Sequence, residues 1–196
     1  MISSIILSAG MSSRMGQPKA LLDWGGETLL AYQVHQLKEA GVDEVIVVLG
    51  DRADEIQRAM KGLPCRTMFN PLHFSGRASS VRIGARAVNR DATAIVIANV
   101  DQPRPASLIR AIIEAHKPES AATVPVFNGS RGHPIIVSGR LRDEMLAATD
   151  DRQGLRGILE AHASEVVEVP ADEMVELDLN TPDDYTAARQ RFGLPV

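Results

Sequence analysis

A long loop near the start of the chain carries residue types that bind phosphate. The apolar run "ISSIILSAG" leads into "MSSRMGQPKALLDWGG", which includes Arg14, Gly16 and Lys19. Strand-to-helix links in α/β folds usually take roughly two to six residues, so a loop of this length calls for an explanation. Successive N–H groups in a glycine-flanked turn can form an anion-binding concavity, and the two cations would add to it. The composition fits a triphosphate site and a solvated surface loop equally well.

The spacing in this loop differs from that of two common phosphate-binding motifs. Five residues separate Gly10 from Gly16, where a Walker A motif has four, and Lys19 follows Gly16 only after two further residues. A dinucleotide fingerprint would need the pattern G-x-G-x-x-G, which this loop lacks. The loop therefore predicts an anion site of another type.

Two carboxylates follow later apolar runs. Asp101 comes directly after "AIVIAN", and Asp178 lies in "VELDLNTPDD" with Asn180 two residues further on. Each carboxylate alone is explained equally well as a turn or capping residue. Together with the loop they favour a Mg²⁺ site, because Mg²⁺ takes one or two carboxylates plus substrate phosphates. The combination predicts phosphoryl or nucleotidyl transfer, which needs charge neutralisation and alignment more than a covalent group.

Zinc and thiol chemistry are disfavoured by the remaining candidates. The histidines show no metal-ligand spacing, and Cys65 lacks the setting of a nucleophile. The histidines are His35, His73, His116, His133 and His162.

A second anion site is suggested by "NPLHFSGRASSVRIGARAV". Gly76, Ser79 and Ser80 would place free backbone donors and a helix N-terminus at the ligand crevice. Arg82 and Arg86 are four residues apart and fall on one helical face. A capped helix with solvated arginines explains the same segment equally well.

The elements that would position these residues alternate between strand and helix. Nearly continuous β-branched runs at 5–7, 44–50, 66–69, 93–100 and 121–127 predict strands buried on both faces, with helical patterns between them. This order predicts an α/β fold of three layers, with a Rossmann-like, open and mostly parallel sheet. Ligands in such sheets bind beyond the carboxyl ends of the strands.

The last third of the sequence is less regular and predicts a small antiparallel excursion. A strand running into a helix is expected over 132–141 and a helix over 153–162, and further strand is expected over 165–170 and 174–180. The final helix is expected over 181–192, with Thr181 as N-cap and Pro182 at its first position.

Composition predicts one soluble domain over residues 1–196, as a monomer or small homo-oligomer. The chain is 44% hydrophobic and 23% charged, with no linker-like segment. The net charge of −4 argues against a nucleic-acid surface, and the absence of a long apolar run argues against a membrane span. A lone Cys65 and the absence of a signal-like N-terminus predict a cytoplasmic protein.

Five segments carry a resemblance to a known family. "LSAGMSSRMGQPKALLDWGGETLL", "NPLHFSGRASSVRIGA", "NVDQPRP", "RGHPIIVS" and "DLNTPDDY" resemble, in order and spacing, the signature segments of the MobA-like nucleotidyltransferases. That family includes molybdenum-cofactor cytidylyltransferases and guanylyltransferases. The resemblance covers nearly the whole chain and implies a fold of the nucleotide-diphospho-sugar transferase type.

The resemblance also implies roles for individual residues. Base or ribose contacts would come from Leu7, Ser8, Ala9 and Gly10. Arg14 and Lys19 would hold the triphosphate and, with Asp101, carry the catalysis. Mg²⁺, or alternatively Mn²⁺, would be bound by Asp101, Asp178 and Asn180. The acceptor side would include Gly76, Ser79, Ser80 and Arg82.

The implied reaction is the transfer of CMP from CTP to molybdopterin, with release of pyrophosphate. Ser8, Ala9 and Gln102 resemble the cytidylyl branch more than the guanylyl branch. The alternatives are a guanylyltransferase, an enzyme acting on a sugar phosphate or another small phosphate, and a non-catalytic nucleotide-binding module. Transient docking to a molybdoenzyme or its chaperone is also implied.

Three positions depart from the family pattern. Val100 stands where the family often has Gly, His73 where Trp is common, and Arg152 where an Asp is usual. The last two lie on the acceptor side, so they leave the identity of the acceptor open.

Overall fold

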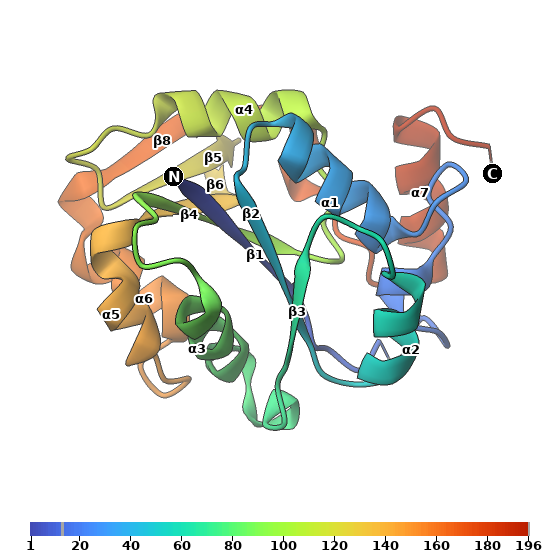
Figure 1. Cartoon of the computed structure of the whole chain (residues 1–196). Helices are drawn as coiled ribbons and strands as arrows, with labels where there is room; N and C mark the ends of the chain where they lie inside the picture. Colours follow the sequence, from blue (N-terminus) through green and yellow to red (C-terminus); the bar gives the residue numbers. More distant parts are fainter. Residues whose placement is uncertain (13, 196) are drawn as a thin grey trace.

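The computed structural model describes residues 1–12 and 14–195, which build an open mixed sheet flanked by helices (Figure 1). The described strands form an eight-stranded sheet in the order β3-β2-β1-β4-β7-β5-β6, and β8 pairs with β5 outside this path. The predicted fold class, an open and mostly parallel α/β sheet with an antiparallel part, is confirmed.

The parallel half of the sheet contains β1 (Ile2–Ser8), β2 (Glu44–Leu49), β3 (Arg66–Phe69) and β4 (Ala94–Asn99). β1, β2 and β4 are largely buried, as predicted, but β3 is an edge strand whose residues are exposed or half-buried, so the prediction of a strand buried on both faces at 66–69 is wrong. Strand β1 lies between β2 and β4, and Ile5 is level with Ile46 on one side and Ile97 on the other. The carboxyl ends of β1 and β4 therefore meet at one edge of the sheet.

The antiparallel excursion lies at the other side of β4. It is formed by β7 (Ile135–Ser138), which pairs antiparallel with β4 and with β5 (Ala122–Phe127). The short β6 (Ser130–Arg131) also pairs antiparallel with β5, whereas β8 (Val166–Pro170) pairs with it in parallel. The expected strand at 165–170 is thus confirmed.

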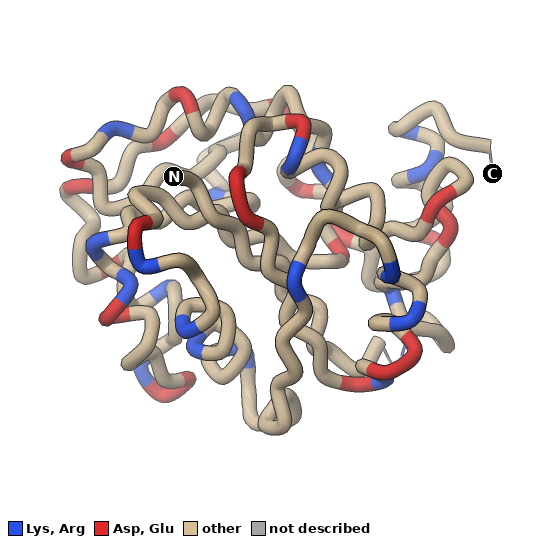
Figure 2. The backbone as a smooth tube through the Cα atoms, in the orientation of Figure 1, with Lys and Arg blue, Asp and Glu red and all other residues tan. Residues whose placement is uncertain are grey.

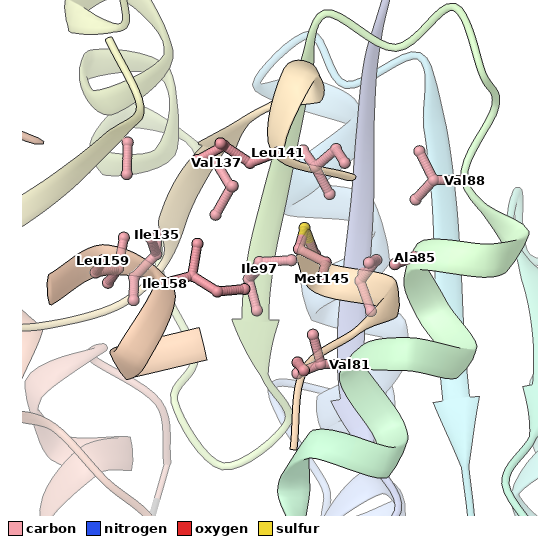
Figure 3. Packing of buried hydrophobic residues seen from close by; sticks show 14 of the residues in the cluster. Val81, Ala85, Val88, Ile97, Ile135, Val137, Leu141, Met145, Ile158 and Leu159 are labelled. Carbon is pink, nitrogen blue, oxygen red and sulfur yellow. The ribbon is translucent and has the colours of Figure 1, made fainter. Parts of the chain in front are cut away.

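Helices cover both faces of the sheet. One face packs against α3 (Arg77–Ala87), α5 (Arg142–Leu146) and α6 (Gly154–Ala161), and Figure 3 shows their side chains around Ile97. The other face packs against α1 (Leu29–Glu39), α2 (Ala53–Ala59) and α4 (Ala106–Ala115). Alternation along β1 explains the two layers, because Ile5 belongs to the first core cluster and Ile6 to the second.

A third, smaller cluster ties the long N-terminal loop to the last helix. Trp24 of the loop packs against Phe192, with ring centroids 5.0 Å apart. Helix α7 (Pro182–Arg191) begins with the expected Thr181 cap, which forms a reciprocal capping box with Asp184. The described part of the loop also contains a 3₁₀ turn, Lys19–Leu21.

The strand expected at 174–180 is absent, which corrects the sequence prediction. A 3₁₀ turn occupies Glu173–Glu176, and Asp172 caps it by accepting a hydrogen bond from the Met174 N–H. The carbonyl groups of Val175 and Leu177 accept hydrogen bonds from the buried guanidinium of Arg104, at 2.8 and 3.0 Å. Those carbonyls are consequently not available for a sheet ladder.

Acidic and basic residues are interspersed along the chain in the view of Figure 2. Positive charge at any one site therefore comes from individual side chains. Among the described helices, none is long and apolar enough to cross a membrane.

Candidate active site

A cavity of about 420 Å³ opens beyond the carboxyl ends of β1 and β4; it is called the first cavity below. Residues from the end of β1, the long loop, the start of α3 and the end of β4 line it. They include the predicted nucleotide-binding residues Leu7, Ser8, Ala9, Gly10, Lys19 and Gln102, the predicted metal ligands Asp101 and Asp178, and the predicted acceptor-side residues Gly76 and Ser80. The fold thus brings together residues that lie far apart in sequence.

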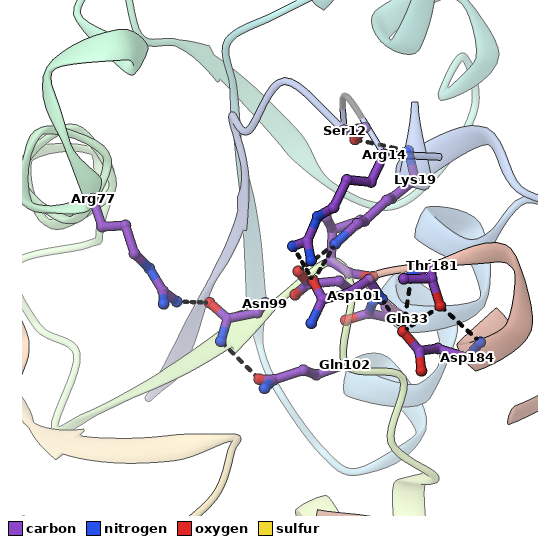
Figure 4. A network of polar contacts seen from close by, with 12 residues as sticks. Ser12, Arg14, Lys19, Gln33, Arg77, Asn99, Asp101, Gln102, Thr181 and Asp184 are labelled. Carbon is purple, nitrogen blue, oxygen red and sulfur yellow. Dashed lines mark hydrogen bonds and ion pairs between the residues drawn. The ribbon is translucent and has the colours of Figure 1, made fainter. Parts of the chain in front are cut away.

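Lys19 is the centre of a polar cluster at one end of this cavity (Figure 4). Its Nζ donates to Oδ2 of Asp101 at 2.9 Å and to Oδ1 of Asn180 at 3.0 Å. Arg14 also donates to Oδ1 of Asn180, at 3.4 Å. The Lys19 backbone N–H donates to the Ser12 hydroxyl at 3.2 Å, which fixes the turn of the loop. The predicted catalytic residues Arg14, Lys19 and Asp101 therefore lie in one network.

Asp178 reaches the cavity from the segment that replaces the expected strand. The Leu179 N–H donates to the carbonyl of Asp101 at 2.8 Å, and this bond holds the two segments together. Oδ1 of Asp178 is buried and finds no hydrogen-bond partner among the described residues. Burial, reinforced by the negative charge of Asp101, raises the pKa of the Asp178 carboxyl above its ordinary value.

This donor set fits a divalent cation that keeps substrate oxygens in its coordination shell. Within residues 1–12 and 14–195, no three His, Cys, Asp or Glu side chains gather as a complete protein cage. Two carboxylates and an amide oxygen are nevertheless present, and the unpartnered oxygen of Asp178 is suited to a cation. Mg²⁺ is usually bound in this way, by one or two carboxylates plus phosphates and water.

A second polar chain, of which the sequence analysis named only Gln102, lies across the cavity from Lys19. Arg77 donates through Nη2 to Oδ1 of Asn99 at 2.8 Å, and Nδ2 of Asn99 donates to Oε1 of Gln102 at 2.7 Å (Figure 4). Because arginine only donates, it fixes the orientation of both amides and leaves Nε2 of Gln102 as a donor. A usable sequence signal was Asn99, a polar residue that ends the apolar run "AIVIAN".

The predicted acceptor-side residues are not all at the cavity. Ser79 and Ser80 are buried, and both hydroxyl groups accept a hydrogen bond from Nδ2 of Asn70 at 2.9 Å. Arg82 donates to the carbonyl of Ala148. Ser79 and Arg82 line neither the first cavity nor a second cavity beside it, which is described below. Their expected contact with the acceptor stays a prediction.

The position expected to bind a second anion is filled by a carboxylate of the protein. Oδ1 of Asp150 accepts a hydrogen bond from the Ala78 N–H at 3.1 Å, at the start of α3. Gly76 precedes this helix with a φ of 115°, and a Cβ there would lie 2.2 Å from Oδ2 of Asp150. A glycine is therefore required both by its backbone conformation and by the carboxylate beside it.

A second cavity of about 680 Å³ adjoins the first, and Leu7 and Arg77 line both. Its apolar wall includes Ile97, Val124, Ile135, Leu155 and Leu159. His133 also lines it, and burial, together with the positive charges of Arg77 and Arg104, lowers the pKa of His133 to about 4. The imidazole is therefore neutral at pH 7.

Comparison with known proteins decides the family. Residues 4–166 match the model of the MobA-like NTP transferase domain. The chain belongs to the MobA-like NTP transferase family. This confirms the resemblance seen in the sequence, and homologues with nucleotidyltransferase names identify the enzyme class as nucleotidyltransferase.

Three proteins that are similar to this chain carry different names. The molybdenum cofactor cytidylyltransferase of Escherichia coli is 31% identical over 97% of both chains. Nicotine blue oxidoreductase of Paenarthrobacter nicotinovorans is 29% identical over 81% of both chains. A probable molybdenum cofactor guanylyltransferase of Bacillus mycoides is 25% identical over 96% of both chains.

Solved structures agree with the MobA-like fold. A nucleotidyl transferase from Methanothermobacter superposes with a TM-score of 0.84 at 28% identity, covering 98% of this chain and 97% of the other. Rv0371c from Mycobacterium tuberculosis, in its complex with manganese, superposes with a TM-score of 0.76 at 28% identity, covering 95% and 96%. The metal in that relative is a divalent ion, which the donor set described above also fits.

Proposed function

We propose that this nucleotidyltransferase transfers CMP from CTP to molybdopterin with the help of Mg²⁺ and releases pyrophosphate. One observation carries the proposal: Lys19 from the long loop meets Asp101 and Asp178 from two distant segments at a single cavity. Arg14 does not line this cavity but joins the same network through Asn180. The name of the 31% identical relative, molybdenum cofactor cytidylyltransferase, supports the choice of substrates.

The proposed step needs no nucleophile from the protein. An oxygen of the molybdopterin phosphate attacks the α-phosphorus of CTP and forms a new P–O bond. The bond between the α-phosphorus and the bridging oxygen breaks, and that oxygen leaves with the electron pair as part of pyrophosphate. Arg14 and Lys19 stabilise the negative charge that grows on this leaving group.

Lys19 changes partners in this proposal. Its ammonium is now paired with the Asp101 carboxylate at 2.9 Å, and the Lys19 side chain is only 11% exposed. A triphosphate entering the cavity would compete for the ammonium and free the carboxylate for a cation. Asp101 and Asp178, with Asn180 beside them, would hold Mg²⁺, or Mn²⁺ as the alternative ion. When bound, the ion supplies charge neutralisation and alignment of the phosphates.

The preference for CTP over GTP rests on the residues around the base. Ser8 and Ala9 line the first cavity, and Gln102 presents Nε2 as a hydrogen-bond donor beside them. A donor there would suit O2 or N3 of cytosine. The family also contains guanylyltransferases, so GTP is the nearest alternative.

The acceptor would lie in the second cavity, with its phosphate toward the first. The second cavity, of about 680 Å³, combines an apolar wall with polar residues such as Arg131, Gln153 and Glu160. This combination suits the pterin of molybdopterin, whose ring faces are apolar and whose ring edges carry hydrogen-bonding groups. A cytoplasmic location and transient docking to a molybdoenzyme or its chaperone belong to the same proposal. A non-catalytic module is the remaining alternative, and it would bind CTP without turnover.

The test is pyrophosphate release, measured for the four nucleoside triphosphates with molybdopterin and with sugar phosphates. Wild type should turn over CTP with molybdopterin, and Lys19→Ala or Asp101→Ala should each lower kcat/KM by about 100-fold or more. Lys61→Ala is a matched control, because Lys61 is exposed and remote from the first cavity. A variant with near-wild-type turnover would remove that residue from the mechanism, and equal turnover of GTP would refute the base preference.

A further inference from the structure

Arg77 lies where the two cavities meet. It is the first residue of α3, its side chain is exposed, and it lines both the first and the second cavity. Only Leu7 shares this position among the residues that line them. A group at this junction would face a ligand in either cavity.

Arg77 forms no ion pair with a described carboxylate, although the Asp150 carboxylate at the start of α3 lines the second cavity with it. Two other arginines line the second cavity, but Arg131 is paired with Glu168 at 2.8 Å and Arg156 with Glu160 at 2.9 Å. The contact of Arg77 is with the neutral amide oxygen of Asn99, and no salt bridge joins it to any described carboxylate. Its positive charge is therefore available to an anionic ligand.

The guanidinium is also held in place. Asn99 is 5% exposed and is itself held by Gln102, so the amide oxygen that receives Nη2 of Arg77 is fixed. Asn99 ends β4 only two residues before Asp101. The same strand end thus positions both the cation at the junction and the carboxylate of the first cavity. Nε and Nη1 of Arg77 have no hydrogen-bond partner in the described part of the chain.

An arginine at the first position of a helix is unfavourable for stability. A cation at the first helical position opposes the helix dipole, which costs roughly 0.3 to 1 kcal/mol. A residue that contradicts its local environment and still projects into a site is often retained for function.

We propose that Arg77 binds the phosphate of the acceptor at this junction and holds it facing the α-phosphate of the nucleotide. The inference rests on the proposed function, because it concerns the acceptor of that reaction. The second hydrogen of Nη2 and the N–H beside it on the same edge of the guanidinium, on Nε or Nη1, donate hydrogen bonds to two phosphate oxygens, while a third oxygen attacks the α-phosphorus. The guanidinium stays protonated, and its charge offsets the repulsion between the two approaching phosphates.

The experiment compares Arg77→Met with Arg86→Met, a control on the same helix that is exposed and lines neither cavity. Pyrophosphate release is measured against molybdopterin at saturating CTP, and then against CTP at saturating molybdopterin. Arg77→Met should raise the KM for molybdopterin by about 10- to 100-fold, the usual range for a charge-assisted hydrogen bond. The KM for CTP should stay within about 2-fold of wild type. The KM of Arg77→Lys for molybdopterin should lie between the values for wild type and Arg77→Met. Arg86→Met should match wild type in both KM values.

An unchanged KM for molybdopterin in Arg77→Met would overturn the inference and leave the proposed function standing. A parallel rise in both KM values would also overturn it, because it would indicate a general disturbance of the site. If Arg77→Met does not fold, Arg77→Gln replaces it, and the same split between the KM values is required.

Equilibrium dialysis with molybdopterin separates the inference from the proposed function. If wild type binds molybdopterin without turnover and Arg77→Met binds it about 10-fold or more weakly, the inference holds and the proposed function fails. If wild type does not bind molybdopterin, both are wrong.

Discussion

Replacing Asp178 by Asn is expected to make the protein more stable and less active. Oδ1 of Asp178 is buried with no hydrogen-bond partner in the described residues, and the Asp101 carboxylate lines the same cavity. Burial first, and then the negative charge of Asp101, raise the pKa of Asp178. The folded protein without a metal ion therefore holds this negative charge at a cost that an uncharged amide would avoid.

The magnitude follows from that environment. An amide at position 178 would leave a buried polar atom unpartnered just as the carboxylate does, so the substitution removes only the cost of the charge. Asp178 is only partly buried, and a stabilising substitution commonly contributes about 0.5 to 2 kcal/mol, so Asp178→Asn should raise the free energy of unfolding by about 1 kcal/mol at pH 7. For a domain of this size that corresponds to a rise in Tm of roughly 2 to 4 °C.

The gain must depend on pH in one direction. A raised pKa means that the folded state binds the proton more tightly than the unfolded state. The contribution of Asp178 to the stability of wild type is therefore most favourable below its ordinary pKa of 3.8. This contribution is lost as the pH rises through the higher pKa that Asp178 has in the folded protein. Asp178→Asn has no such titration. The difference in stability between the two proteins should be small near pH 3.5 and reach its full size at neutral pH.

The assay is urea unfolding at several pH values without added metal, followed by pyrophosphate release with Mg²⁺. Asp91→Asn is the control, because Asp91 is exposed and remote from both cavities. Turnover of Asp178→Asn should fall by about 100-fold, since a proposed metal ligand is lost. If Asp178→Asn is no more stable than wild type at pH 7, or if its gain is the same at pH 3.5, the electrostatic reasoning is refuted.

Two further predictions concern the elements that support the site. Asn70→Ala should destabilise the protein by about 2 kcal/mol in urea unfolding, because the buried hydroxyls of Ser79 and Ser80 lose a shared donor; a loss below about 0.5 kcal/mol, the size of an ordinary surface substitution, would contradict this. Arg189→Met removes the 2.6 Å ion pair with Asp23 and the hydrogen bonds of the guanidinium to the Tyr185 hydroxyl and to the carbonyls of Asp23 and Pro195. It should raise the KM for the nucleotide several-fold and lower the free energy of unfolding by about 1 to 2 kcal/mol. An unchanged nucleotide KM would show that α7 does not support the loop.

The sequence was sufficient to predict the order of strands and helices and the edge of the sheet where the site lies. Lys19 and Asp101 could be found because each follows a buried strand, and parallel strands meet at their carboxyl ends. The segment 174–180 was mistaken for strand because its apolar residues alternate. Its carbonyl groups are instead bound by Arg104, a side chain that lies some seventy residues earlier and whose position no local pattern reveals.

The structure shows which charged side chains near the site are paired, and the sequence does not. From composition alone, Arg14 and Lys19 of the loop would both be taken as unpaired cations. In the structure the Lys19 ammonium forms an ion pair with Asp101 and a hydrogen bond with Asn180. The helix start expected to attract an anion already holds the carboxylate of Asp150. Arg77, which no motif singled out, keeps its charge because its contact is a neutral amide. Arg14 and Arg77 form no ion pair with a described carboxylate, so an entering phosphate can bind either of them without displacing the ion pair of Lys19. Arg77 is the one of the two that lines both cavities.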